Sequence, residues 1–258
     1  MKAFLIAAFG CAASLGSATI LAKWDFNSYP SDGSSTTGVL TPVAGWGYAS
    51  RVGAVTGSFA RGAFDNLSAG FDKMPNVLID PEDAVNNNSG WNLANFAAQG
   101  TGSGTRGAEF LVSTVGYTDI QLSFAMRLSN TASRYWRLDY TLDGSTWLTK
   151  EYFDHNYCYL WGAGQSPWYD HFVSFTNVEG VADNPNFGVR ILAVFQDEAT
   201  GVGDALYLPH SPGSAYGTSG TGRFDLVTFE GREAVPEPAT LTALALGIGG
   251  LAWKRRRR

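Results

Sequence analysis

The stretch Ile120-Gln121-Leu122-Ser123-Phe124-Ala125-Met126-Arg127-Leu128 decides the fold class of this chain. Large apolar side chains occupy every second position from Ile120 to Leu128, and the residues between them are polar or small. Successive side chains of a β-strand point to opposite faces, so this alternation predicts a strand with one buried face. An amphipathic helix would instead repeat its apolar residues at positions i+3 and i+4.

A second alternating stretch follows and turns back on itself. Apolar residues alternate with charged or polar ones from Trp136 to Leu142, and Asp143-Gly144 comes next. This pair favours a hairpin turn, because both residues tolerate left-handed backbone. We therefore expect the segment from Trp147 to Phe153 to return along its partner.

Other short apolar segments extend the pattern through the chain. They lie at residues 24–27, 91–96, 109–114, 172–175, 187–196 and 224–229, with Gly/Ser-rich stretches at 31–38, 100–107 and 211–222. With 258 residues, 45% of them hydrophobic, the chain can build one sizeable core. Strands at this spacing without helical patterns between them predict an all-β fold, a single antiparallel β-sandwich of the jelly-roll kind.

The charge of the chain is unevenly distributed. Its net charge is −5, but residues 23–235 hold 12 Lys/Arg against 22 Asp/Glu, and the cations gather at the end of the sequence. An acidic body gains nothing from phosphate pairing or counterion release. We therefore exclude nucleic acid as a partner.

The N-terminus carries an export signal. Lys2 precedes an apolar run from Ala3 to Leu15, and small residues follow at Gly16-Ser17-Ala18 and again at Ala22. These are the parts of a secretory signal peptide, recognised by a Sec-type export machinery. Cleavage after Ala18 and cleavage after Ala22 both fit. We assign residues 1–22 to the signal, because the sequence from Lys23 onward already has the pattern of a strand.

The C-terminus carries three ordered elements. Pro236-Glu237-Pro238 is followed by an apolar segment, Leu241–Trp253, and then by five cations at 254–258. A helix from Ala239 to Trp253 would be roughly 22 Å long against a hydrocarbon core of roughly 30 Å, and terminal cations can snorkel to the lipid surface. The cations predict a cytoplasmic C-terminus and hence an exported body.

These three elements resemble the PEP-CTERM sorting signal of Gram-negative bacteria that make extracellular polysaccharide. The resemblance covers residues 233–258 and makes Pro236, Glu237 and Pro238 the sorting motif. It implies an exosortase, a membrane-embedded protease, as the processing partner. It also implies anchoring in the inner membrane during sorting, followed by placement at the cell surface or in the extracellular matrix.

The middle of the chain resembles a jelly-roll module of secreted bacterial proteins. The resemblance rests on turn and strand signals at residues 112–120, 140–145, 184–190 and 223–227. It implies a β-sandwich domain, which we place at residues 23–232, and it carries no catalytic residues.

One segment of this domain has the composition of a sugar-binding site. Residues 152–172 interleave aromatic side chains with amides, carboxylates and imidazoles. Aromatic faces stack on sugar rings while polar groups bind hydroxyls. The same composition also suits the core of a hairpin, so both interpretations stay open. The candidate ligand-binding residues are Trp161, Trp168, Tyr169, His155 and Asp170.

A cation site is a further hypothesis. Asp25 and Asp225 lie in the first and last expected strands, so they meet if those strands adjoin. Carboxylate oxygens are ligands that Ca²⁺ prefers. The alternative is that both residues are ordinary polar groups at strand ends.

Two classes of function fit the sequence. The first is a non-catalytic surface or matrix protein whose β-sandwich binds extracellular polysaccharide. The second is a small secreted hydrolase or lyase, since jelly rolls host such enzymes too. No catalytic motif selects the second, and fold alone does not decide between them.

Overall fold

A computed structural model describes residues 17–62, 86–156 and 168–234 of the chain. Several sequence predictions fall outside these ranges: the apolar run of the signal peptide, the sorting motif Pro236, Glu237 and Pro238, the apolar segment 241–253, the basic tail 254–258, and Trp161. The described part of the chain contains no helix with the length and apolar character needed to cross a bilayer.

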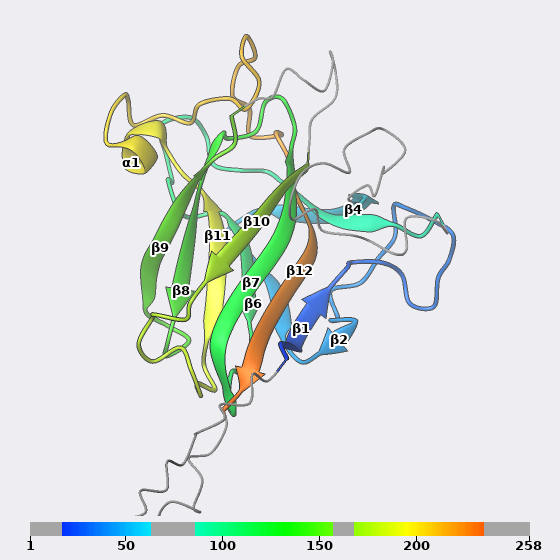
Figure 1. Ribbon diagram of the computed structural model, residues 1–258. Coiled ribbons are helices and arrows are strands. Elements are labelled where there is room, and N and C mark those ends of the chain that lie inside the picture. Colours follow the sequence, from blue (N-terminus) through cyan, green and yellow to red (C-terminus); the bar gives the residue numbers. More distant parts are fainter. Residues whose placement is uncertain (1–16, 63–85, 157–167, 235–258) are drawn as a thin grey trace, which may run out of the picture.

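Two antiparallel sheets form the sandwich (Figure 1). The larger, sheet A, has seven strands and runs in the order β10-β7-β12-β1-β2, with β5 pairing to β12 and β4 pairing to β5. Its strands are β1 (Thr19–Trp24), β2 (Ala44–Gly45), β4 (Thr56–Arg61), β5 (Ser89–Ala94), β7 (Tyr117–Leu128), β10 (Trp168–Ser174) and β12 (Gly222–Glu233).

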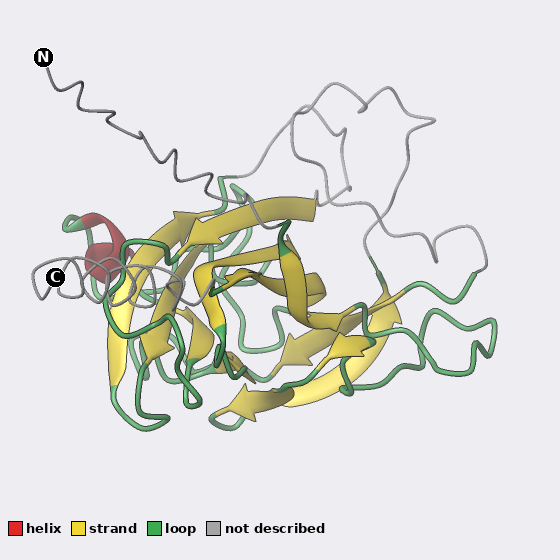
Figure 2. Cartoon of the chain, turned by 60° about the horizontal axis from the view of Figure 1, so that its bottom comes forward, coloured by secondary structure: helices red, strands yellow, loops and turns green. Residues whose placement is uncertain are grey.

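The smaller sheet, sheet B, has five strands in the order β3-β6-β11-β8-β9. They are β3 (Tyr48–Val52), β6 (Gly107–Leu111), β8 (Tyr135–Thr141), β9 (Trp147–Asp154) and β11 (Gly188–Ala193). The helix of the described ranges, α1 (Gln196–Thr200), is a single short turn outside the sheets (Figure 2). The fold is thus the all-β antiparallel sandwich that the alternation predicts.

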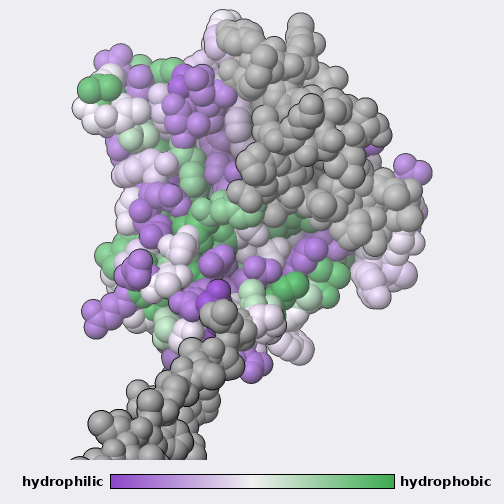
Figure 3. All heavy atoms as spheres, viewed as in Figure 1, coloured by the Kyte–Doolittle hydropathy of each residue, from purple (hydrophilic) through white to green (hydrophobic). Residues whose placement is uncertain are grey.

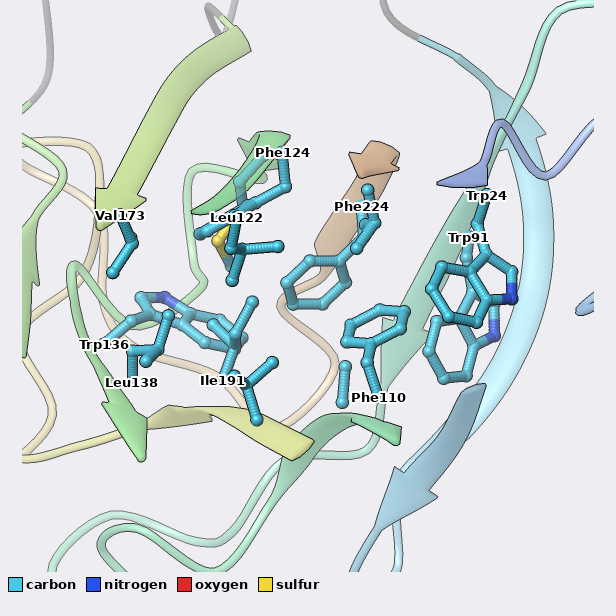
Figure 4. Close-up of a cluster of buried hydrophobic side chains, with 14 of the residues drawn as sticks. Trp24, Trp91, Phe110, Leu122, Phe124, Trp136, Leu138, Val173, Ile191 and Phe224 are labelled. Carbon is cyan, nitrogen blue, oxygen red and sulfur yellow. The ribbon is translucent and has the colours of Figure 1, made fainter. Parts of the chain in front are cut away.

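An aromatic core joins the two sheets (Figure 4). Trp24, Trp91 and Phe224 of sheet A meet Phe110 and Trp136 of sheet B, and all five are buried. Trp24 and Phe110 have ring centroids 5.3 Å apart, and Trp136 packs edge-on against Phe224 at 6.0 Å. Such large rings dominate core energetics, so the sandwich holds together without a disulfide among the described residues.

The strands that alternate most clearly are confirmed. The five apolar residues of the opening stretch lie within β7 and are all buried. The turn at Asp143-Gly144 joins β8 to β9, and its carboxylate accepts hydrogen bonds from the N–H groups of Ser145 and Thr146. Gly144 has a φ of +77°, the left-handed conformation expected there.

The first strand differs from its prediction. β1 starts at Thr19 and ends at Trp24, whereas the sequence pattern suggested residues 24–27. The chain leaves the extended conformation at Phe26, whose φ is +56°. Residues 19–24 pair with β12 instead, with Thr19 opposite Gly231 and Trp24 opposite Val227.

This pairing bears on where the signal peptide is removed. Cleavage after Ala22 would delete Thr19 to Ala22 from β1, and with them the buried side chains of Leu21 and Ala22. Cleavage after Ala18 leaves the strand whole and places the small residues Gly16 and Ala18 before the cut.

We therefore predict that the exported protein begins at Thr19. Intact-mass spectrometry of the secreted chain, or sequencing of its N-terminus, checks this. An N-terminus at Lys23 would contradict it, and would mean that β12 keeps only a two-residue remnant of its β1 partner.

Candidate functional site

The outer face of sheet A carries a continuous row of polar and aromatic side chains. Strand pairing aligns Trp168 with Arg127, Arg127 with Arg223, and Arg223 with Asn92. Residues paired across antiparallel strands project to the same side of the sheet, so this row crosses β10, β7, β12 and β5. We call this surface the sheet A face.

The two neighbouring rows complete the sheet A face. Asp170, Ala125 and Asp225 form one, and Phe172 and Ser123 begin the other. Phe172 is 53% exposed. Trp168 and Phe172 therefore flank Asp170 on the outer side of β10, roughly 13 Å apart along the strand.

Packing fixes the Trp168 ring. The ring lies against Ala125 and Leu226, both of which are buried. Its Nε1 is itself buried and has no hydrogen-bond partner within the described ranges. The indole is thus held by apolar contact beneath it. Figure 3 shows apolar side chains in the middle of this side of the molecule, bordered by hydrophilic ones.

Two arginines face each other across β7 and β12 in the row that begins at Trp168. The pKa of Arg223 is lowered to about 10, mainly by burial and then by the neighbouring charge of Arg127, against the opposing effect of Asp225. Burial also lowers the pKa of Arg127. Both remain protonated at neutral pH. Arg223 donates from Nε to Asn92 Oδ1 at 3.3 Å and from one terminal nitrogen to the carbonyl of Arg61 at 2.7 Å, which holds its guanidinium in the row.

The remaining candidates of the sugar-site hypothesis lie on the other side of β10. Tyr169 and His171 pair with Met126 and Phe124, which belong to the core. His155 follows β9 and is 1% exposed. The structure therefore brings Trp168 and Asp170 together on the outer face, and Tyr169 and His155 together inside.

All three histidines of the chain gather at this inner edge. His155 Nε2 lies 3.0 Å from His171 Nε2, and Tyr169 Oη lies 2.8 Å from His210 Nε2. His155 Nδ1 faces the carbonyl oxygen of Arg134 at 3.2 Å, and a carbonyl only accepts, so this nitrogen carries the proton. The proton between the two imidazoles then belongs to His171.

Their burial suppresses protonation. Burial lowers the pKa of His171 to about 4. The pKa of His210 is also lowered to about 4, mainly by burial and then by the positive charge of Arg134. The pKa of His155 is also well below its usual value, mainly through burial and then through His171. The cluster is neutral and packs like core, with His171 stacked on Phe124 at 4.6 Å.

The first and last strands do adjoin, as the calcium hypothesis requires. Asp225 is fully buried, and its Oδ1 accepts the N–H of Leu226 at 2.8 Å. A Cβ on Gly62 would overlap Asn88 Oδ1 and approach Asp225 Oδ2, so these two oxygens converge where glycine leaves room.

A cation at this place would need amide ligands. Asp25 Oδ1 accepts the N–H of Asn27 at 3.2 Å. In the described ranges, no three His, Cys, Asp or Glu side chains group around a common point. The oxygen donors of Asp225 and Asn88, beside a glycine, are nevertheless of the kind that Ca²⁺ accepts.

Comparison with known proteins identifies the C-terminal signal. Residues 234–258 match the family described as the PEP-CTERM protein-sorting motif. The resemblance of the C-terminal segment to that sorting signal is confirmed, and the motif indicates an exported protein sorted by an exosortase. No curated protein matches the chain.

Several solved carbohydrate-binding modules are similar in outline. One is the CBM22-1–GH10 part of Clostridium thermocellum xylanase 10B complexed with xylohexaose (TM-score 0.40, 12% identity, 73% of this chain and 27% of that one). Another is the CBM22-1 xylan-binding domain of Paenibacillus barcinonensis Xyn10C (TM-score 0.39, 9% identity, 87% of this chain and 100% of that one). A third is the family 11 carbohydrate-binding module of Clostridium thermocellum with a mixed-linked tetrasaccharide (TM-score 0.32, 10% identity, 77% of this chain and 93% of that one). Likeness at this level assigns no ligand to this chain.

We predict that the histidine cluster makes the fold sensitive to mild acid. Because the folded pKa values lie below the unfolded value of about 6.5, stability is complete above pH 6.5 and falls as the pH drops toward 4. The melting temperature should therefore fall by several degrees between pH 7.5 and pH 5, where carboxylates stay ionised. Thermal unfolding across this range measures it.

The variant His171→Asn serves as the control for this effect. It removes one buried imidazole, so the slope of melting temperature against pH should become shallower. An unchanged melting temperature from pH 7.5 to pH 5 in the wild type would contradict the assignment.

Proposed function

We propose that this protein is an exported, surface or matrix-bound polysaccharide-binding protein without catalytic activity. Its path runs through Sec-type export, inner-membrane anchoring during sorting, and exosortase processing at Pro236, Glu237 and Pro238. The sorting motif at 234–258 supports this path.

The sheet A face supports the binding activity. Its β10 edge carries two aromatic side chains, Trp168 and Phe172, and a carboxylate and two guanidiniums lie beside them. Sugar rings offer apolar C–H faces and hydroxyl edges, which match aromatic faces and charged hydrogen-bonding groups respectively. The observation that carries the proposal is this combination on one rigid face. Trp161 belongs to the same candidate set from the sequence.

The alternative of a hydrolase or lyase has one observation in its favour. Asp170 and Asp225 flank Ala125 across three strands, and paired carboxylates hydrolyse glycosides. Asp225, however, is fully buried and accepts a backbone hydrogen bond, so water and substrate do not reach it in this structure. We therefore favour binding. Release of new reducing ends from a bound glycan would support the enzyme instead.

The first test of the sheet A face removes the two aromatic side chains of its β10 edge. We expect Trp168→Ala combined with Phe172→Ala, in the full chain in mild detergent, to lower affinity for retained polysaccharides about tenfold or more. Affinity electrophoresis through gels containing single polysaccharides measures it. Tyr29→Ala is the matched control, because Tyr29 is 86% exposed and lies elsewhere.

The melting temperature of each variant separates binding from folding. Retention equal to wild type in a folded double variant would contradict this face as the site. Failure of the wild type to be retained on any polysaccharide would contradict the binding function itself.

We propose further that Asp25 and Asp225 mark a structural Ca²⁺ site, completed by amide oxygens such as that of Asn88. Bound calcium at a hundredfold excess over its dissociation constant should raise the melting temperature by about 5–10 °C. A chelator should reverse this rise, and Asp225→Asn should abolish it. Glu179→Gln, at an exposed position, is the control. A melting temperature indifferent to both calcium and chelator would contradict the site.

A further inference from the structure

The crossover between the two sheets presents two aromatic side chains to solvent. Trp46 is 89% exposed and Tyr48 is 77% exposed. They lie where the chain passes from β2 in sheet A to β3 in sheet B. Tryptophan is highly buried on average, so such exposure on an ordered backbone calls for an explanation. We call this pair the crossover platform.

The backbone under the crossover platform is fixed from both sides. Gly45 has a φ of +71°, and a Cβ there would overlap the carbonyl oxygen of Leu21. The N–H of Trp46 donates to that same carbonyl at 2.9 Å. A Cβ on Gly47 would lie 2.6 Å from Cη2 of Trp24. Gly47 thus faces the core, and the side chains on either side of it are directed away from the core.

The support beneath Gly47 is an aromatic part of the core. Trp24 packs against Phe110 at 5.3 Å and Phe229 at 6.2 Å, and its Nε1 donates to the carbonyl of Leu40 at 2.9 Å. The platform therefore sits on backbone that folding has already ordered. A ligand binding there loses little affinity to ordering the main chain.

Polar groups continue the same surface along β3. Ser50 shares the outer side of β3 with Tyr48, and its Oγ donates to Glu109 Oε1 at 3.2 Å. Arg190 Nε donates to Glu109 Oε2 at 2.7 Å. Beside this row, a hollow of about 470 Å³ follows the edge of β3, lined in part by Ser50 and Arg51. Platform and hollow together extend roughly 13 Å along the strand.

We infer that the crossover platform and the adjoining edge of β3 form a second polysaccharide-binding surface, separate from the sheet A face. Sugar rings stack on Trp46 and Tyr48. Further along the sugar chain, Glu109 accepts hydrogen bonds from hydroxyls, and Ser50 accepts or donates them. The elongated shape fits a linear segment of a few sugars rather than a single small molecule.

Other occupants fit less well. Two aromatic side chains bury roughly 150–250 Å² each, about half of the roughly 800 Å² per partner that a stable dimer requires. The acidic body of the domain disfavours nucleic acid and anionic lipid. A sugar chain, by contrast, requires only flat apolar faces next to hydroxyl-binding groups.

The inference rests on the proposed function for its ligand class only, since the two surfaces share no residue. The test compares four full-length proteins in mild detergent by affinity electrophoresis on each retained polysaccharide: wild type, Trp46→Ala/Tyr48→Ala, Trp168→Ala/Phe172→Ala, and the variant with all four changes. Tyr29→Ala again controls for loss of an exposed aromatic, and Trp46→Phe/Tyr48→Phe tests rescue by conserved stacking.

We expect the platform variant to lose about tenfold in affinity, the Phe replacements to restore most of it, and the fourfold variant to lose the retention left by either pair alone. The loss of affinity in the platform variant is expected even if the sheet A variant binds normally. In that case only the proposed sheet A site is contradicted. Retention unchanged by the platform variant in both backgrounds would overturn the inference. The inference would also be overturned if the platform variant lost retention and its molecular mass in light scattering were half that of the wild type. That result would assign the platform to contact with a second copy of the chain.

Discussion

The pairing of the first strand with the last is the constraint on which the rest of the structure depends. β12 is the hub of sheet A, with β1 on one side, β7 on the other and β5 at its start. Through these partners it places Phe224 and Phe229 in the core and aligns Arg223 with Arg127 on the opposite face. β1 contributes Trp24, whose ring packs beneath Gly47 and thereby supports the crossover platform. Both candidate binding surfaces are therefore positioned by the same strand pair, although they lie on different parts of the sandwich.

Much of this architecture could be predicted from local pattern. β7 and β8 alternate in sequence, so their existence and inward faces follow from side-chain period, and β9 follows from the turn at Asp143-Gly144. β3 and β4 could not be predicted in this way, because they are mostly exposed and their sequences show no alternation of apolar and polar residues. The start of β1 was hidden for a different reason: Thr19 to Ala22 have the composition of a signal-peptide end, yet they pair with β12. The platform could not be predicted from the sequence, because two aromatic residues in a short segment suit a core as well as a surface. Only the tertiary contact of Gly47 with Trp24 shows that Trp46 faces outward.

β10 shows how one strand separates two tasks. Its even-numbered residues Trp168, Asp170 and Phe172 form one end of the sheet A face, while Tyr169 and His171 enter the histidine cluster. Composition made Trp168, Tyr169 and Asp170 sugar-binding candidates together, since tyrosine, histidine and aspartate suit a binding site and a polar core equally well. The strand period of two is what divides them. A substitution on one side of β10 can therefore alter binding with little effect on the buried imidazoles, and the reverse also holds.

The direction in which the chain leaves the sandwich has a mechanical consequence. Ala234 donates its N–H to the carbonyl of Gly116 just after β12, so the chain is held to the sheet up to the last described residue. When the chain is held beyond this point and a ligand pulls on the far end of sheet A, the load runs parallel to β12. The hydrogen bonds to β1 and β7 are then sheared together rather than opened one after another like a zipper. A domain strung between a fixed point and a fibrous matrix in this orientation resists extension far better than one held across its strands.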